Sequence, residues 1–142
     1  MELGHSMERI YIDTNIFIYF MEVNDEFSNK TRSIIKYLHA NKIEIVTSEL
    51  TIAECLVKPI KENSIALVSL YLELLQNKAR FSVIPVSKTI LMESAKVKAE
   101  TNGDLPDCIH LATARFSRCK HIFSHDAMKT PKDIELVGVD SF

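Results

Sequence analysis

The chain has 142 residues, of which 46% are hydrophobic and 25% charged, and this composition suits one globular domain with a sizeable core. Three glycines and four prolines make long flexible linkers unexpected. The formal net charge of -2 excludes a protein that binds nucleic acid through bulk positive charge alone, although it permits a local basic rim.

The termini and the cysteines carry no targeting or redox motif. No apolar run approaches the roughly 18 residues that span a bilayer, and the N-terminus lacks the basic-then-apolar order of a signal peptide. Met1–Ser6 precede a second start-like Met7 and are either a native tail or an addition from cloning, so we expect one domain over 7–142. The odd set of Cys55, Cys108 and Cys119 forms no C-x-x-C pair and predicts reduced thiols, no zinc site and a cytoplasmic protein.

Strand-like and helix-like segments alternate along the whole chain. The first half predicts a strand ending at Asp13, a short helix over NIFIYFM, a helix over Asp25–Ala40, a strand over KIEIVTS, and a helix capped by Ser48 that runs through Val57 with Pro59 just beyond it. The second half predicts a largely buried helix over Asn63–Ala79, a strand over RFSVIPV, a helix from Ser87 to about Thr101, a helix over LPDCIHLATARF, a strand over CKHIFSHD, and an edge strand within IELVGVDSF. This order indicates an α/β fold with a mostly parallel sheet covered on both faces.

Four acids are predicted to meet at one edge of that sheet. Asp13 and Asp126 end two strands, and Asp107 lies in the first turn of a helix whose apolar face is Leu105, Cys108, Ile109, Ala112 and Phe116. Glu54 falls on the stripe that should face the core, together with Leu50, Ala53 and Val57. Because ligands bind outside the carboxyl ends of parallel strands, this edge is the expected site.

Carboxylates this close repel one another unless protons, water or a cation intervene. Two of them about 4 Å apart repel by about 4 kcal/mol at an effective dielectric constant of 20. Oxygen ligands favour hard cations, so the acids predict a Mg²⁺ or Mn²⁺ site suited to hydrolysis of a phosphodiester.

Each acid also has a purely structural interpretation. Asp107 can favour the helix dipole with Asp104 as the cap, and Asp126 can cap a turn. Asp13 can cap the helix that follows it, and Glu54 can pair with Lys58 one turn later. Their shared edge is what favours function.

Polar neighbours could support such a site. Thr14, Asn15 and Ser124 can hydrogen-bond a carboxylate or a metal-bound water, or can be ordinary capping residues. His110 follows Asp107 by one turn and is interpreted as a packed or solvated residue. No G-x-S-x-G elbow and no glycine-rich phosphate loop occurs, so acyl transfer and nucleoside-triphosphate hydrolysis have no support.

Four segments together resemble PIN-domain ribonucleases of the VapC toxin type. They are YIDTNIFIYF, TSELTIAE, LPDCIHLATA and IFSHD, and their order and spacing cover the chain from Met7 onward. The resemblance implies a three-layer α/β/α sandwich and assigns catalytic and metal-binding roles to Asp13, Glu54, Asp107 and Asp126. It implies supporting roles for Asn15 or Thr14 and for Ser124. The chain departs from the family pattern in lacking an aromatic residue after Asp126 and in reducing a glycine-rich run to TNGDLPD.

The same resemblance implies RNA as substrate, products with a 3′-hydroxyl and a 5′-phosphate, an antitoxin partner and a homodimer. Leaving out the four acids changes the formal charge from -2 to +2, and candidate basic residues for an RNA-binding rim are Lys58, Lys61, Arg115, Arg118, Lys120 and Lys129. NIFIYFM and the Leu-rich segment 65–75 could offer an antitoxin groove or a dimer surface, or could be core.

Three rival functions can be weighed against the sequence, and the last two fall well behind. A catalytically inactive PIN-like module would bind RNA or protein only, although all four acids are present. A receiver-type phosphoacceptor would need an acidic pair after the first strand and an Asp after the third, which the chain lacks. A haloacid-dehalogenase phosphatase would need D-x-D where this chain has DTN.

Overall fold

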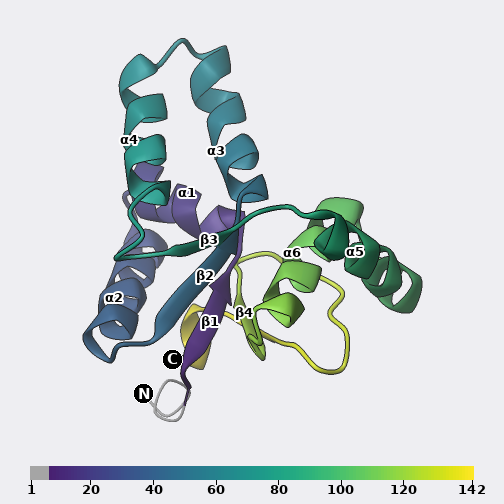
Figure 1. Ribbon diagram of the computed structural model, residues 1–142. Coiled ribbons are helices and arrows are strands. Elements are labelled where there is room, and N and C mark those ends of the chain that lie inside the picture. Colours follow the sequence, from purple (N-terminus) through teal and green to yellow (C-terminus); the bar gives the residue numbers. More distant parts are fainter. Residues whose placement is uncertain (1–6) are drawn as a thin grey trace.

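A central parallel sheet lies between two layers of helices in the computed structural model, which describes residues 7–142 (Figure 1). The interpretation of Met1–Ser6 as a tail lies outside the described residues. The strands are β1 (Arg9–Ile12), β2 (Glu44–Ser48), β3 (Ser82–Ile84), β4 (His121–Phe123) and β5 (Glu135–Val137). The helices are α1 (Thr14–Glu22), α2 (Glu26–Ala40), α3 (Leu50–Lys61), α4 (Ile65–Leu75), α5 (Lys88–Thr101), α6 (Leu105–Phe116) and the short 3₁₀ helix η1 (Val139–Ser141).

The sheet has the order β3-β2-β1-β4-β5, and all neighbouring strands pair in parallel. The predicted parallel sheet is therefore confirmed, with β5 at one edge. The chain proceeds outward from β1 to β2 and β3 and then returns to place β4 on the other side of β1. This reversal makes the carboxyl ends of β1 and β4 the topological switch point, where α/β proteins bind their ligands.

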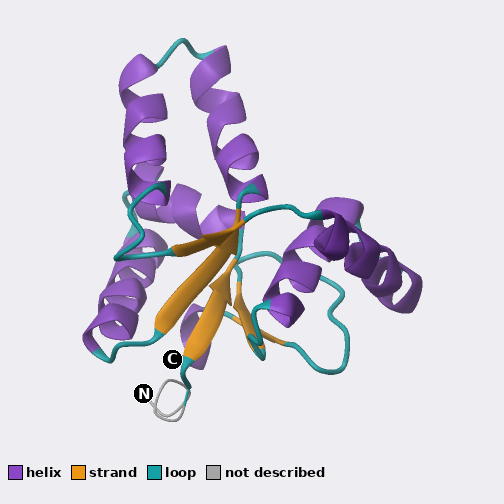
Figure 2. Cartoon of the chain, in the orientation of Figure 1, coloured by secondary structure: helices purple, strands orange, loops and turns teal. Residues whose placement is uncertain are grey.

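Successive side chains of β1 point to opposite faces of the sheet, and the core therefore has two parts, one on each face. Ile10 and Ile12 face a cluster that includes α1, α2 and residues of α3 and α4, whereas Tyr11 faces the opposite cluster, built with α5 and α6. All three side chains are fully buried. The helices thus cover both faces of the sheet, and the predicted α/β/α sandwich is confirmed (Figure 2).

Local capping residues explain where several helices begin and end. Asp25 and Ser28 form a reciprocal capping box at the start of α2, and Ser87 caps α5 through the backbone N–H of Ile90. Helix α5 ends at Asn102, whose φ of 57° is left-handed and therefore suits a helix stop. These boundaries agree with the sequence signals.

The predicted burial of α4 and the predicted end of α3 are wrong. Pro59 lies inside α3, and α4 is shorter than predicted, with only Tyr71, Leu74 and Leu75 buried. Ile65 is 82% exposed. The reason is architectural, because α3 and α4 form a hairpin that projects beyond the sheet and only its base packs against the body (Figure 1).

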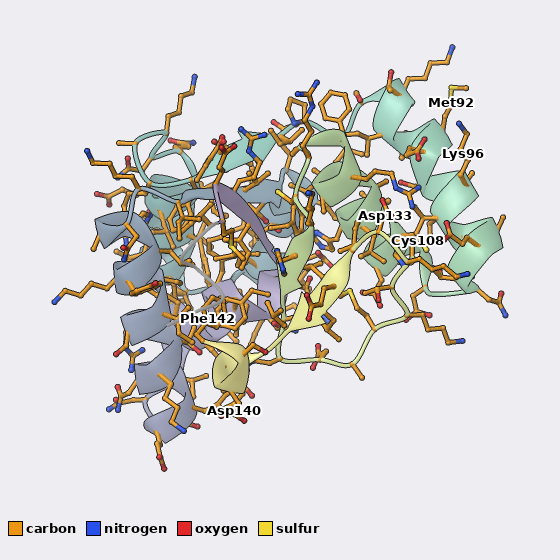
Figure 3. The ribbon with its side chains drawn as sticks, turned by 90° about the horizontal axis from the view of Figure 1, so that it is seen from below. Met92, Lys96, Cys108, Asp133, Asp140 and Phe142 are labelled. Carbon is orange, nitrogen blue, oxygen red and sulfur yellow. The ribbon has the colours of Figure 1, made fainter. Side chains whose placement is uncertain are left out.

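The apolar face predicted for α6 is only partly correct. Cys108 and Ala112 are buried, but Leu105 and Phe116 at the two ends are more than half exposed. The helix lies between the sheet and α5, so its covered surface is wider than one stripe and includes Leu111 and His110. In Figure 3, Cys108 lies inside this layer while Met92 and Lys96 lie on the outer side of α5.

The remaining sequence expectations concern cysteines and membrane spans. Cys55, Cys108 and Cys119 are free and buried, and burial raises the pKa of the Cys55 and Cys119 thiols to about 12. Within 7–142, no helix is both long and apolar enough to cross a membrane. The C-terminal segment packs against α2, where Phe142 contacts the core residue Phe123 (Figure 3).

Candidate active site

Asp13 lies at the switch point, directly after β1. Its backbone N–H donates to the carbonyl of Phe123 at 3.0 Å, which continues the pairing of β1 with β4. Its Oδ1 accepts from the N–H of Thr14 at 2.9 Å, so it caps α1, and its Oδ2 accepts from the Ser124 hydroxyl at 2.7 Å. Asp13 is only 7% exposed. The capping interpretation and the edge position predicted for Asp13 are both correct, since one carboxylate does both.

Asn15 connects Asp13 to Asp126. Its side-chain amide donates to Asp126 Oδ2 at 2.8 Å and to Ser124 Oγ at 3.0 Å, and reaches Asp13 Oδ2 at 3.3 Å. Its Oδ1 accepts from the N–H of His125 at 3.2 Å. The prediction that Asp126 ends a strand is wrong, because β4 ends at Phe123 and Asp126 lies in the following loop. The Asn15 amide, rather than the strand, brings Asp126 to the site.

Glu54 comes from the second turn of α3 but not from its buried stripe. The buried positions of this helix are Thr51, Cys55 and Pro59, because α3 touches the body along that line and leaves Val57 exposed. Glu54 lies beside the stripe, and its Oε1 accepts from Thr14 Oγ1 at 2.8 Å. The predicted core-facing position is therefore wrong by one helical step, and Lys58 pairs with other acids instead of Glu54.

A second donor to Glu54 is His110, which comes from α6. Its Nε2 lies 2.6 Å from Glu54 Oε1, and its Nδ1 lies 2.6 Å from the hydroxyl of Tyr11. Burial raises the pKa of Glu54, but the hydrogen bonds from His110 and Thr14 outweigh this effect and leave the pKa below its ordinary value. Glu54 is therefore held as an ionised carboxylate.

Asp107 faces the same edge from the first turn of α6. Among the residues that the structure describes, none donates a hydrogen bond to its carboxylate. Its pKa is raised by burial first and then by the negative charge of Asp13, with smaller contributions from Asp104 and Glu54. The charges of acids from three different elements thus act on one another, as the edge position predicts.

Within 7–142, no Lys or Arg side chain lies at ion-pair distance from Asp13, Glu54, Asp107 or Asp126, which we call the edge acids. The only ion-pair partner that the described part provides is His110. No three acidic, His or Cys side chains of this part converge closely enough to form a ready-made metal cage. The edge acids are therefore a loosely spaced group of carboxylates without a protein cation.

The sequence interpretation assigned no role in this network to Tyr11, to His110, or to Thr51, whose hydroxyl lies 3.0 Å from that of Thr14. Tyr11 is two positions before Asp13, so it shares a face of β1 with it, and that spacing was the available signal. His110 was interpreted as a packed or solvated residue, and it is packed, with only 1% exposed. Its hydrogen bonds with Tyr11 and Glu54 link residues 99 and 56 positions apart, which no local pattern reveals.

The basic residues predicted for an RNA rim do not all lie near the site. Lys58 follows Glu54 by one turn of α3, and Lys129 lies beside Gly103 at the start of α6. Arg118 and Lys120 lie at the opposite, amino end of β4, because they precede it in a parallel sheet. Arg115 donates two hydrogen bonds to Asp133 and one to Glu93, and it also pairs with Glu100 at 3.5 Å. We call Arg115, Asp133, Glu93 and Glu100 the Arg115 cluster.

Comparison with known proteins places this arrangement in a family. The model of the PIN domain matches residues 10–129, which is most of the chain and includes all four edge acids. The chain belongs to the PIN domain family. The sequence resemblance to this family is thereby confirmed. No curated protein sequence matches the chain.

Solved structures share the fold of this PIN domain at low sequence identity. A chain of a toxin–antitoxin complex from Klebsiella pneumoniae is 22% identical, with a TM-score of 0.67 over 92% of this chain and 97% of that chain. VapBC2 from Rickettsia felis, bound to a DNA fragment from its promoter, gives 14% identity and a TM-score of 0.71 over 92% and 98%. VapC20 from Mycobacterium tuberculosis, described as a toxin that cleaves the sarcin–ricin loop, gives 15% and 0.65 over 83% and 90%.

Proposed function

We propose that this PIN domain is a divalent-metal-dependent endoribonuclease that acts as a VapC-type toxin. The observation that carries the proposal is the group of edge acids, which has no Lys or Arg partner within 7–142 and in which burial, and then the charge of Asp13, raises the pKa of Asp107. Such a group is destabilised by its own charge unless an external cation joins it. Family membership and the likeness to toxins support the same function.

The donor set fits Mg²⁺ or Mn²⁺. All four candidate ligands are carboxylates, and hard cations prefer oxygen. Mg²⁺ usually keeps several waters and binds one or two carboxylates directly, so it does not need the closed cage that is absent from residues 7–142. When bound, the ion would supply a water of lowered pKa and would stabilise negative charge on the phosphate.

The residues of the chain have separate roles around that ion. Asp13, Glu54 and Asp107 would hold it directly or through water, and Asp126 would hold it or a second ion. Thr14, Asn15 and Ser124 keep the carboxylates of Glu54, Asp126 and Asp13, respectively, in place through hydrogen bonds of 2.7–2.8 Å. We expect cleavage of RNA to leave a 3′-hydroxyl and a 5′-phosphate.

RNA would approach along the basic residues near this edge. Lys58 is 71% exposed at its side chain and Lys129 is exposed, so both can contact phosphates, and Lys61 extends the same side of α3. Arg115 is held by acids, and Arg118 and Lys120 lie at the other end of β4, so we leave these three out of the rim. Changing Lys58 and Lys129 together to Ala should weaken RNA binding, with a smaller salt dependence.

The direct test is cleavage of a mixed RNA pool in Mg²⁺ or Mn²⁺, with EDTA as a control. Asp13→Ala and Asp107→Asn should abolish cleavage while the far-UV circular dichroism spectrum stays that of the folded chain. Asp104→Asn is the matched control, since Asp104 lies three residues before Asp107 but forms no side-chain cap bond. Equal cleavage by wild type and Asp13→Ala would refute the assignment.

A protein partner is part of the same proposal. The similar structures include toxin–antitoxin complexes, and the α3–α4 hairpin exposes Val57, Ile60, Ile65 and Leu70, a surface suited to an apolar helix of an antitoxin or to a second copy of the chain. Light scattering gives the molar mass of the protein in solution and thereby tests for a homodimer. Co-purification followed by mass spectrometry identifies a bound antitoxin, which would also block cleavage.

An inactive PIN-like module that binds RNA or protein remains the second candidate. It is favoured only if purified wild type, shown by mass spectrometry to be free of partner, leaves every RNA intact in both metals.

A further inference from the structure

A buried chain of hydrogen bonds runs from the core of the sheet to one edge acid. The Tyr11 hydroxyl lies 2.6 Å from His110 Nδ1, and His110 Nε2 lies 2.6 Å from Glu54 Oε1. Tyr11 and His110 are at most 1% exposed, whereas about a third of the Glu54 side chain is exposed. Packing thus fixes Tyr11 and His110, at the buried end of this series of hydrogen bonds, whereas Glu54 at the other end faces solvent.

We propose that Tyr11 and His110 are positioning residues, which orient the Glu54 carboxylate for a divalent cation. This inference rests on the proposed function, because it assigns a purpose to Glu54 as a ligand. It adds to that function two residues that contact neither RNA nor the reacting atoms.

The direction of the hydrogen bonds follows from the groups themselves. A neutral imidazole has one N–H and one bare nitrogen. Glu54 Oε1 can only accept from His110, so the proton is on Nε2, and Nδ1 is then the acceptor for the Tyr11 hydroxyl. The Tyr11 phenol carries its own O–H, so it can donate to this bare nitrogen. Tyr11 and Glu54 thus favour the same tautomer of the neutral His110 ring, the one that donates to Glu54.

The two oxygens of Glu54 are treated differently. Oε1 accepts from both His110 and the Thr14 hydroxyl, which come from α6 and α1. Within 7–142, no residue donates to Oε2. One oxygen is thus anchored and the other is free for a ligand, and an anchored carboxylate need not be ordered when the ion arrives.

A purely structural histidine would not need this arrangement. Buried polar groups are costly unless they are hydrogen-bonded, and an apolar residue could fill the same space without that requirement. Here the phenol and both ring nitrogens are used, and the hydrogen bonds join β1, α6 and α3, which are elements that the core already packs together by other contacts. Glu54 is the only partly exposed group in this series of hydrogen bonds.

The test is the affinity of the purified full chain for Mn²⁺, measured by titration with electron paramagnetic resonance, alongside Tm. His110→Leu should weaken Mn²⁺ binding about 10- to 100-fold, and Tyr11→Phe should weaken it about 3- to 10-fold. His110→Gln keeps an N–H that can reach Glu54 and should restore part of the affinity. Each value refers to the folded fraction, which Tm and the circular dichroism spectrum report.

Two matched variants control for lost buried hydrogen bonds. Thr113→Val removes a buried hydroxyl of α6 that bonds Ile109, and Tyr71→Phe removes a buried phenol hydroxyl that bonds Glu22. Both should lower Tm and leave the Mn²⁺ affinity unchanged. A spectroscopic measurement is independent of the metal, because ¹⁵N shifts of the imidazole should show the Nε2–H tautomer in wild type and a mixture of tautomers in Tyr11→Phe.

The outcomes separate this inference from the function on which it rests. If wild type binds Mn²⁺ and cleaves RNA, but Tyr11→Phe and His110→Leu bind Mn²⁺ as wild type does and lose only Tm, the positioning role is wrong and the nuclease stands. If wild type neither binds Mn²⁺ nor cleaves RNA, the proposed function is wrong and the positioning role is wrong with it.

Discussion

The edge acids and the Arg115 cluster are both built from Asp and Glu side chains, but the surroundings shift the pKa of Asp107 and of Asp133 in opposite directions. In the Arg115 cluster the guanidinium hydrogen-bonds Asp133 and Glu93, and it lowers the pKa of both. At the switch point, residues 7–142 provide no Lys or Arg, and burial together with Asp13 raises the pKa of Asp107. The first group carries the permanent counter-charge of Arg115, whereas the second has no Lys or Arg within 7–142, and this difference separates a structural ion-pair network from a candidate catalytic site.

The largest expected difference between the two groups is in cleavage. Glu54→Gln should lower the initial rate by about 10²–10³-fold, because an amide neither attracts a cation nor balances its charge. Glu93→Gln is the same substitution in the Arg115 cluster and should leave the rate within about twofold of wild type. The measurement is the initial rate at saturating Mn²⁺. Comparable losses in both variants would mean that the comparison is wrong.

A smaller effect, and one of the opposite kind, is expected for Arg115→Met. This change removes three charge-assisted hydrogen bonds and leaves Glu93, Glu100 and Asp133 close together without a cation. We expect the free energy of unfolding to fall by about 1–2 kcal/mol, which corresponds to about 3–8 °C in Tm. Thermal unfolding in EDTA measures this loss, and RNA cleavage at 25 °C serves as the control that should not change.

The smallest effects are a pair of opposite shifts in stability with pH. Because the pKa of Asp107 is raised in the folded chain, its ionisation destabilises the fold as pH rises through that raised value. Because the pKa of Asp133 is lowered, its ionised form stabilises the fold, and this contribution is lost as pH falls through the lowered value. At pH 7 without metal, Asp107→Asn should therefore raise Tm and Asp133→Asn should lower it, each by about 1–3 °C.

Thermal melts between pH 3 and pH 8 in EDTA test both signs together. The gain in Asp107→Asn should vanish as pH falls below the ordinary value for Asp, about 3.9, and the loss in Asp133→Asn should vanish at lower pH still. Shifts of the same sign at pH 7 would show that the two groups do not differ in this respect.

Much of the fold could be predicted because strand ends are local signals. Asp13 follows an apolar run directly, and the parallel sheet places that position beside the end of β4, whatever the exact lengths of the strands. The helix starts near Asp25 and Ser87 were predictable for the same reason. A prediction that depends on only a few neighbouring residues stays correct even when the predicted bounds of other elements are wrong.

Other features of the fold and the site depend on contacts between elements that are far apart in the sequence. The α3–α4 hairpin projects from the body, so apolar residues such as Ile65 and Val57 that read as core are exposed, and Glu54 is displaced from the expected stripe. Arg118 was predicted as a residue of the RNA rim, but it precedes β4 and therefore lies at the other end of that strand from Asp126. The contact of Tyr11 with His110 depends on how α6 lies on β1, which no single segment specifies.

The hydrogen bond from Asn15 to Asp126 also bears on how the protein is made. It joins positions 111 residues apart, and the Ser124 bond to Asp13 has the same separation. A chain emerging from the ribosome has Asp13 early, yet Asp126 and Ser124 arrive only after both helical layers have been synthesised. Contacts of such long range form late in folding. The candidate site is therefore completed only after β4 and the loop that follows it have been synthesised, so the order of synthesis itself delays the assembly of the edge acids.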